Sequence, residues 1–204
     1  MKLYTDYIWD FDGTLFDSYP HSARALCAAA RHFGVTLDDQ AVYAAMRVSF
    51  ANAYALAGLD ETQLQLFHQL RGDDAFPPPI APFPHAEAAL RALSERGARH
   101  FLYTHSNRRM SLRFIERYGL ADYFTGYVTA DSEGFARKPS PDAVRYILER
   151  WRIDPRRAVM VGDRALDMAC ARAAGIDGIL VAPDRLVPNA PAACRVDDLL
   201  DIVP

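Results

Sequence analysis

Two short stretches of the chain, DFDGT at 10–14 and VGDRALD at 161–167, bring acidic residues together directly after apolar runs. Carboxylates that crowd one another repel unless a cation lies among them, and a set of oxygen ligands selects a hard ion such as Mg²⁺. Asp10 and Asp163 are the expected ligands of that ion. The sequence therefore predicts a metal site that two distant segments share.

A hydroxyl and an internal lysine extend this pattern. Thr104 follows the apolar run HFLY, and Lys138 is one of only two lysines among 23 basic residues. A phosphate dianion that approached a metal site would need positive charge and hydrogen-bond donors. We expect Lys138, the Thr104 hydroxyl and backbone amides around Gly13 and His105 to supply them.

The elements that must position these residues alternate between strand and helix. We expect strands at 3–9, 100–104, 127–129, 158–161 and 178–182, with helices between them that include 107–118 and 164–174. Such alternation is typical of an α/β fold with a doubly wound parallel sheet. In these sheets ligands bind outside the carboxyl ends of the strands, so the candidate residues are expected to converge there.

The first two expected strands are separated by much more chain than one crossover helix requires. Helical patterns at 18–33, 38–47, 49–57 and 60–71 fill this gap, and the proline-rich segment PPPIAPFP ends it. Ser18 is the expected cap of the first helix. We therefore expect a small inserted α-helical domain at 16–83, and an α/β core domain formed by residues 1–15 and 84–204.

Four motifs in this order resemble those of the haloacid dehalogenase-like superfamily. They are DFDGTLFDS at 10–18, LYT at 102–104, RKPSPD at 137–142 and VGDRALD at 161–167. The helical insertion resembles the small cap of subfamily I, in its phosphoglycolate phosphatase-like branch. The resemblance implies a Mg²⁺-dependent phosphatase that acts on a small phosphorylated metabolite, phosphoglycolate-like or a sugar phosphate, through an aspartyl-phosphate intermediate.

The same resemblance implies a role for each motif residue. Asp10 would be the nucleophile and a metal ligand. Asp12 would be the general acid and base, with its backbone carbonyl on the metal. Thr104 and Lys138 would hold the phosphate, and Lys138 would also pair with Asp10. Asp163 would complete the metal site.

Other residues have roles that the resemblance leaves open. Asp167 would bind the metal through water or orient its neighbours. In the cap, His21 and Arg47 could contact a polar leaving group, as could His68 and Arg71, although solvated helix faces would explain the same residues.

The chain departs from the family pattern at two histidines. His105 stands where the family often has Asn after the phosphate-binding threonine, and His85 stands where Gly usually follows the proline that re-enters the core. Either imidazole could change the leaving-group preference or the pH dependence. A packed or solvent-facing imidazole without such a role is the alternative for both.

Proteins with other functions, inside and outside this family, have sequence features that can be compared with this chain. Asp12 argues against a dehalogenase, whose halide leaving group needs no proton. The absence of lysine between Lys2 and Lys138 argues against a phosphonate hydrolase. A phosphosugar mutase of the same family stays an alternative. Outside the family, a receiver-like domain would have its lysine last and no such insertion, and a catalytically silent binding protein would have a substituted catalytic position.

The composition of the chain indicates which partners, cellular location and cysteine chemistry to expect. A formal net charge of -3 without a basic stripe argues against a nucleic-acid partner. No apolar run has the length of a membrane span and no signal peptide is evident, which favours a cytoplasmic enzyme. Three widely spaced cysteines favour buried free thiols over a disulfide framework or a zinc site. The oligomeric state cannot be inferred from the sequence.

Overall fold

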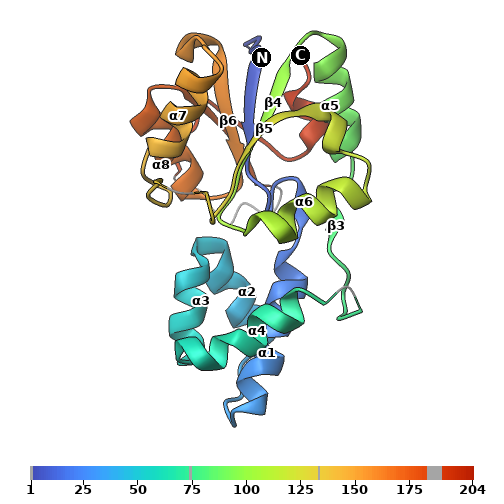
Figure 1. The fold of residues 1–204 in the computed structure, drawn as a ribbon, viewed down its shortest axis with the longest axis vertical. Helices are drawn as coiled ribbons and strands as arrows, with labels where there is room; N and C mark the ends of the chain where they lie inside the picture. The colour runs from blue at the N-terminus through green and yellow to red at the C-terminus, as the bar shows by residue number, and fades with distance from the viewer. Residues whose placement is uncertain (1, 74, 133, 183–189) are drawn as a thin grey trace. The chain divides into compact units, whose positions relative to one another are not determined.

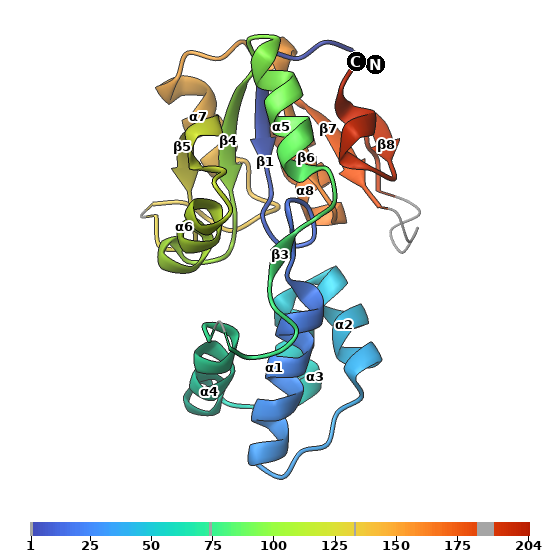
Figure 2. The same cartoon turned by 90° about the vertical axis from the view of Figure 1, so that its right-hand side faces the viewer.

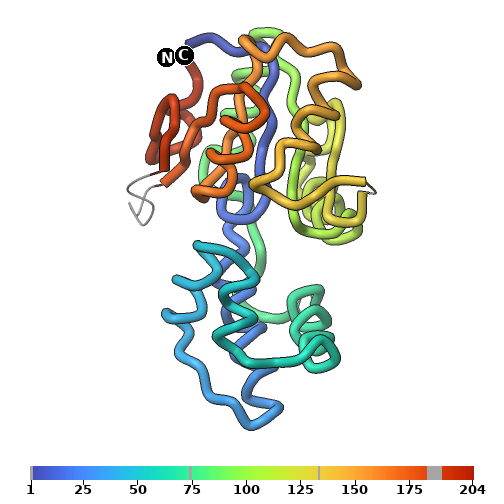
Figure 3. The backbone as a smooth tube through the Cα atoms, turned by 90° about the vertical axis from the view of Figure 1, so that its left-hand side faces the viewer, coloured from blue at the N-terminus to red at the C-terminus, as the bar shows by residue number. Residues whose placement is uncertain are grey.

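The chain forms two compact units in the computed structural model, which describes residues 2–73, 75–132, 134–182 and 190–204. The sheet unit consists of Met1–Phe16 and Pro82–Pro204, and the helical unit consists of Asp17–Ala81. Two short strands, β2 (Phe16–Asp17) and β3 (Ala81–Pro82), pair where the chain passes between the units. Figure 3 traces the backbone of both units, coloured by residue number.

The sheet unit is built around six strands in the order β5-β4-β1-β6-β7-β8, and all neighbouring strands are parallel. The strands are β1 (Asp6–Trp9), β4 (Arg99–Tyr103), β5 (Phe124–Val128), β6 (Ala158–Gly162), β7 (Asp177–Val181) and β8 (Cys194–Val196). From β1 the chain adds β4 and β5 on one side, then returns to add the other strands on the opposite side. The expected doubly wound α/β fold is confirmed.

Helices cover both faces of this sheet. They are α5 (Ala86–Glu95), α6 (Arg108–Arg117), α7 (Asp142–Arg150) and α8 (Ala165–Ala174). Figures 1 and 2 show α7 and α8 on one face and α5 on the other. Because both faces are covered, the central strands β1 and β6 are buried along their whole length. Their apolar side chains form the core with the inward sides of α7 and α8.

Some strand positions differ from the expected ones. Strand β1 begins at Asp6 rather than residue 3, since Leu3 is exposed, and β5 begins three residues earlier than expected. The short strands β2, β3 and β8 were not predicted, because two or three residues have no readable periodicity. The sequence after residue 182 predicts a loop and a short terminal helix. The structure has a 3₁₀ turn at Leu199–Ile202, and residues 183–189 of that loop lie outside the described residues.

The helical unit contains α1 (Tyr19–His32), α2 (Asp39–Val48), α3 (Phe50–Ala57) and α4 (Glu61–Arg71). Asp60 and Gln63 form a reciprocal capping box at the start of α4, which satisfies two backbone donors there. Ser18 does not cap α1 through its side chain, contrary to expectation, because its backbone is already helical. The unit buries its own apolar core, in which Leu26, Met46 and Phe67 are fully buried.

The cysteines are free among the described residues, as expected, but only two are buried. Cys27 and Cys170 are buried, whereas Cys194 on strand β8 is partly exposed. The expectation of burial is therefore wrong for Cys194. Within the described ranges, no helix has the length and apolar character needed to cross a membrane.

Candidate active site

The register of the sheet brings the candidate residues to one edge of the sheet unit. Trp9, the last residue of β1, pairs with Leu102 of β4 and with Val161 of β6. Asp10 therefore leaves the sheet beside the ends of both neighbours, near the point where Thr104 leaves β4. The strand order reverses here, which is where ligands bind in open parallel sheets. The motif side chains are all buried at this edge: Asp10, Asp12, Thr104, Lys138, Asp163 and Asp167.

Lys138 connects two of these carboxylates. Its Nζ lies 2.7 Å from Oδ1 of Asp10 and 2.8 Å from Oδ1 of Asp167, and it lies 4.6 Å from the centre of the Tyr103 ring. Burial alone would lower the pKa of Lys138, but the two carboxylates outweigh burial and raise it. The ammonium is therefore charged, and it pairs with Asp10 as the sequence led us to expect.

Asp167 is held by the main chain as well as by the lysine. Its Oδ2 accepts a hydrogen bond of 3.0 Å from the Arg164 amide. A side chain at Gly162 would place Cβ 2.4 Å from Asp167 Cβ, so glycine is required there. Burial works to raise the pKa of Asp167, but Lys138 and Arg164 outweigh it and hold the pKa low. Asp167 thus contacts both Lys138 and the Arg164 main chain, and its two expected roles both stay predictions.

Three carboxylates are arranged as a metal site would require. One oxygen each of Asp10, Asp163 and Asp167 lie within 4.8 Å of one another, and all three residues are buried. The Thr14 hydroxyl donates to Asp163 Oδ1 at 3.4 Å, which orients that carboxylate. An all-oxygen set of this kind fits Mg²⁺.

Arg164 also lies in this cluster, and the sequence analysis did not assign it a role. Its guanidinium is buried, with Nη2 3.3 Å from Asp10 Oδ2 and Nε 3.9 Å from both Asp163 Oδ1 and Asp167 Oδ2. A basic residue directly after Asp163, an expected metal ligand, was the available signal. Lys138 and Arg164 are outnumbered by the buried aspartates of the motifs in the described cluster, so a cation would offset the excess of acidic groups.

A serine that the sequence analysis also missed holds Asp12. The Ser106 hydroxyl donates to Asp12 Oδ2 at 2.6 Å, and its backbone amide donates to the Thr104 hydroxyl oxygen at 3.0 Å. Ser106 is buried, and it lies two residues beyond Thr104. The short loop after β4 thus connects the expected acid and base to the expected phosphate ligand.

Gly13 and His105, whose neighbouring backbone amides were expected to bind phosphate, make different contacts in the structure. The Gly13 amide donates to the Phe16 carbonyl oxygen at 2.8 Å, and phosphate binding by the backbone amides around Gly13 stays a prediction. A φ of 78° explains why glycine stands at this turn. His105 lies beside the site, where its Nε2 accepts a hydrogen bond of 2.8 Å from the Lys138 amide.

The candidate residues of the helical unit are mostly buried within that unit. Both ring nitrogens of His21 face carbonyl oxygens, of Pro78 at 2.7 Å and of Arg71 at 3.0 Å. Arg47 is buried with its guanidinium 5.6 Å from the centre of the Tyr19 ring. The interpretation as solvated helix faces is therefore wrong for His21 and Arg47.

Two other side chains complete this set. Arg71 donates from Nε to the Ser22 hydroxyl at 2.9 Å, whereas His68 is exposed. Solvation explains only His68.

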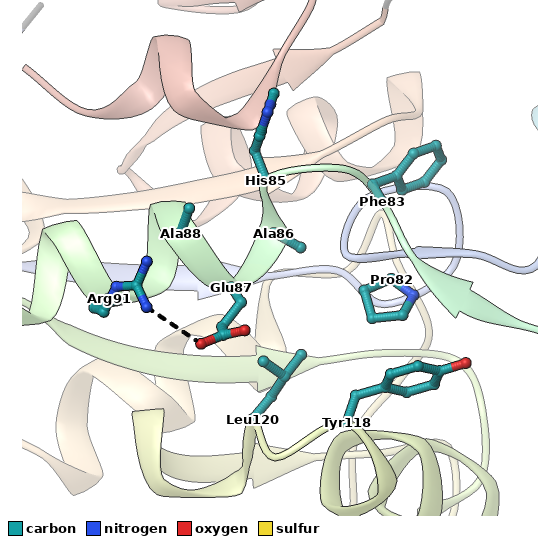
Figure 4. A pocket seen from close by; sticks show the side chains of 9 residues that line it. All are labelled: Pro82, Phe83, His85, Ala86, Glu87, Ala88, Arg91, Tyr118 and Leu120. Atoms are coloured by element: carbon teal, nitrogen blue, oxygen red, sulfur yellow. Dashed lines mark ion pairs between the residues drawn. The ribbon is translucent and has the colours of Figure 1, made fainter.

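A separate hollow of about 340 Å³ lies at the start of α5 (Figure 4). His85 is at its rim and has a φ of 65°, which explains the usual glycine at this position. Its Nδ1 lies 2.8 Å from Asp198 Oδ2, and Figure 4 shows its ring directed away from the Glu87–Arg91 ion pair. None of the motif residues lines this hollow.

Comparison with known proteins decides the family. A model of the haloacid dehalogenase-like hydrolases matches residues 7–175. The chain belongs to this family. A phosphoglycolate phosphatase of Rhodospirillum rubrum is 31% identical over 188 residues, which cover 85% of this chain and 78% of that protein. The chain is therefore a hydrolase of the phosphoglycolate phosphatase-like branch, as its motifs indicated.

Two further relatives differ in what they support. The plasmid-encoded phosphoglycolate phosphatase of Cupriavidus necator is 37% identical over 119 residues, but this match spans 58% of the chain and only 51% of that relative. The crystal structure of a predicted phosphoglycolate phosphatase from Haemophilus somnus covers 100% of this chain and 98% of its own, with a TM-score of 0.85 and 19% identity. The second match supports the fold alone.

Proposed function

We propose that this protein is a Mg²⁺-dependent phosphatase that acts on a small phosphomonoester, phosphoglycolate-like or a sugar phosphate, through an aspartyl phosphate on Asp10. The observation that carries this proposal is the buried cluster of Asp10, Asp163 and Asp167 with Lys138 bonded to two of its members. Fixed charges act more strongly on a phosphoryl group where water is excluded. The names of the related phosphoglycolate phosphatases support the same substrate class.

Asp10 acts as the nucleophile in this mechanism. One of its oxygens forms a bond to phosphorus while the bond from phosphorus to the ester oxygen breaks. Burial raises the pKa of Asp10, and the charges of Lys138 and Arg164 oppose this and favour the reactive carboxylate. Mg²⁺ would be held by Asp10, Asp163 and the Asp12 carbonyl, and it would supply charge neutralisation at the phosphoryl oxygens.

Asp12 moves the protons. Its carboxyl group donates a proton to the departing ester oxygen, and the resulting carboxylate then accepts a proton from water as that water attacks phosphorus. The bond between phosphorus and Asp10 breaks, which releases phosphate and restores both aspartates. The hydrogen bond from Ser106 restricts rotation of the Asp12 carboxylate during both steps.

Thr104 and Lys138 hold the phosphoryl oxygens. The Thr104 oxygen accepts the Ser106 amide, so its own hydrogen is available to a phosphate oxygen. The ammonium of Lys138 already lies on the nucleophile, where a bound phosphoryl group would also meet it.

We also propose that the helical unit Asp17–Ala81 serves as a cap that excludes water and bulky substrates during turnover. Arg47 is the residue of this unit that we expect to influence which leaving group is accepted. A purified Arg47→Ala variant should change the relative rates across a panel of phosphorylated metabolites.

Hydrolysis of p-nitrophenyl phosphate tests the proposal. Purified protein with Mg²⁺ should release nitrophenol, EDTA should abolish the release, and excess Mg²⁺ should restore it. Unchanged release in EDTA would exclude the metal-dependent mechanism. If neither p-nitrophenyl phosphate nor any member of a metabolite panel is hydrolysed with Mg²⁺ present, the phosphatase proposal is wrong.

A further inference from the structure

His105 connects two loops that are distant in sequence. It directly follows Thr104 at the end of β4, and its ring Nε2 accepts the Lys138 amide hydrogen at 2.8 Å. A backbone N–H can only donate, so Nε2 carries no proton and the ring hydrogen of the neutral imidazole is on Nδ1. The structure therefore assigns one tautomer to this histidine.

The surroundings of His105 keep the imidazole neutral. Burial lowers its pKa to about 3, with help from the nearby charges of Lys138, Arg164 and Arg137. Protonation at Nε2 would also place its hydrogen against the Lys138 amide hydrogen, and the two would repel each other. The acceptor thus stays available at neutral pH.

The hydrogen bond that His105 accepts comes from Lys138, whose ammonium must be placed accurately to meet a phosphoryl group. Lys138 must keep its Nζ within 2.8 Å of two carboxylates while its main chain lies in the segment before α7. Tyr103 flanks both residues, with its ring 4.6 Å from Lys138 Nζ and 6.0 Å from the His105 ring. His105 holds the backbone end of the lysine, and Tyr103 with the carboxylates holds its other end.

We propose that the His105 side chain is a positioning residue, which fixes the Lys138 main chain so that the ammonium meets the phosphoryl group. This role rests on the proposed phosphatase function and deepens it. It differs from the donation by the His105 backbone amide that the sequence suggested. The rival role is direct donation from Nδ1–H to the substrate, because Nδ1 has no hydrogen-bond partner within the described part of the chain.

Three variants separate the two roles. The Oε1 of glutamine reaches the position of Nε2, so His105→Gln keeps the acceptor for Lys138 but loses a donor at Nδ1. The shorter asparagine can place a donor near Nδ1 but cannot reach the Lys138 amide. His105→Ala removes both groups. His32→Asn, an exposed histidine of the helical unit, is the matched control.

The positioning role predicts a definite order. His105→Asn and His105→Ala should lower kcat/KM for p-nitrophenyl phosphate and weaken competitive inhibition by inorganic phosphate by about tenfold each, as the loss of one hydrogen bond to a buried amide implies. His105→Gln and His32→Asn should stay within about twofold of the unmodified protein. Melting temperatures of all variants identify any that fail to fold, and the comparison of glutamine with asparagine does not depend on the alanine variant.

A double-mutant cycle with Lys138→Met provides a second measurement. If His105 acts through the lysine, His105→Ala should cause no further loss of phosphate affinity, measured by calorimetry with inorganic phosphate, in the Lys138→Met background. An equal loss in both backgrounds would overturn the proposal. So would a rescue by asparagine but not by glutamine, which would assign direct donation, or four variants that bind phosphate like the unmodified protein.

These outcomes differ from a failure of the function itself. An unmodified protein that hydrolyses no phosphomonoester refutes the phosphatase proposal. An active unmodified protein with an active His105→Ala variant refutes only the role of His105.

Discussion

The two units of the molecule bury polar groups in different ways. At the edge of the sheet unit, charged side chains are bonded to one another, as Lys138 is to Asp10 and Asp167. In the helical unit, His21 and Arg71 are bonded to neutral carbonyl and hydroxyl oxygens of their own unit around an apolar core. The first arrangement concentrates charge where a ligand can use it, and the second only stabilises a fold. Substitutions in the charged cluster of the sheet unit should therefore change rate, and substitutions in the apolar core of the helical unit should change stability.

The largest effect is expected for Asp10→Asn. Removal of the nucleophile should lower kcat for p-nitrophenyl phosphate by at least about 10³-fold. The melting temperature should not fall, because burial disfavours the charged carboxylate that is removed. Asp122→Asn, an exposed aspartate of the same unit, is the control. Equal activity of Asp10→Asn and the unmodified protein would refute the nucleophile assignment.

Phe67→Ala tests the expectation that the apolar core of the helical unit determines stability. Phe67 is fully buried in the helical core, and its truncation should destabilise the protein by about 3–5 kcal/mol. Urea denaturation followed by circular dichroism measures this loss, with the partly exposed Leu56→Ala as the control. If Phe67→Ala were as stable as the control, the helical unit would not depend on this core.

His100 tests whether a buried polar group of the sheet unit can act on stability alone. The residue lies near the start of β4, whereas Thr104 follows the end of this strand. Its Nδ1 accepts the Trp9 indole hydrogen at 2.9 Å. Burial lowers the pKa of His100 to about 4, below its ordinary value of 6.5. The unfolded chain therefore binds a proton that the folded protein excludes.

The sign of the pH dependence follows from this. Stability should decrease as the pH falls from 6.5 towards 4, by up to about 3 kcal/mol from this group. Denaturation between pH 7 and pH 4.5 should show a smaller slope for His100→Gln than for the unmodified protein. Parallel curves for the two proteins would contradict the assignment.

Ser106→Ala should give the smallest of these effects, and it should distinguish an effect on kcat from an effect on KM. Loss of the 2.6 Å hydrogen bond to Asp12 should lower kcat by about tenfold, the value expected for one bond to a charged group. KM for p-nitrophenyl phosphate should change little, because Ser106 orients the proton donor rather than the phosphate. A variant with unchanged kcat would show that Asp12 needs no such support.

The sequence predicted the sheet better than the details of its edge. Strands such as β6 are continuous apolar runs because both of their faces are covered, so they could be recognised without knowledge of their partners. Strand β8 could not be recognised, because its three residues become a strand only through hydrogen bonds with β7. The Ser18 cap failed for a similar reason, since the side-chain type permits a cap but the backbone conformation decides it.

Within the site, the sequence singled out residues whose type is dictated by the expected chemistry. Asp10 and Lys138 stood out because a metal and a phosphate require such groups, and the two residues are in contact. Ser106 and Arg164 did not stand out, because a serine or an arginine in a loop has many ordinary explanations, and His105 stood out only as a departure from the family pattern, without a contact assigned to its ring. The positions of their partners determine what they do.

The sequence by itself determined the kinds of side chain that the site contains, their order along the chain and the parallel sheet that gathers them, because periodicity and residue type are local properties. Only the tertiary structure decided which groups touch: Lys138 with Asp167, Ser106 with Asp12, and the His105 ring with the Lys138 backbone. These contacts depend on strand register and on the course of loops, which arise from interactions between segments up to 94 residues apart.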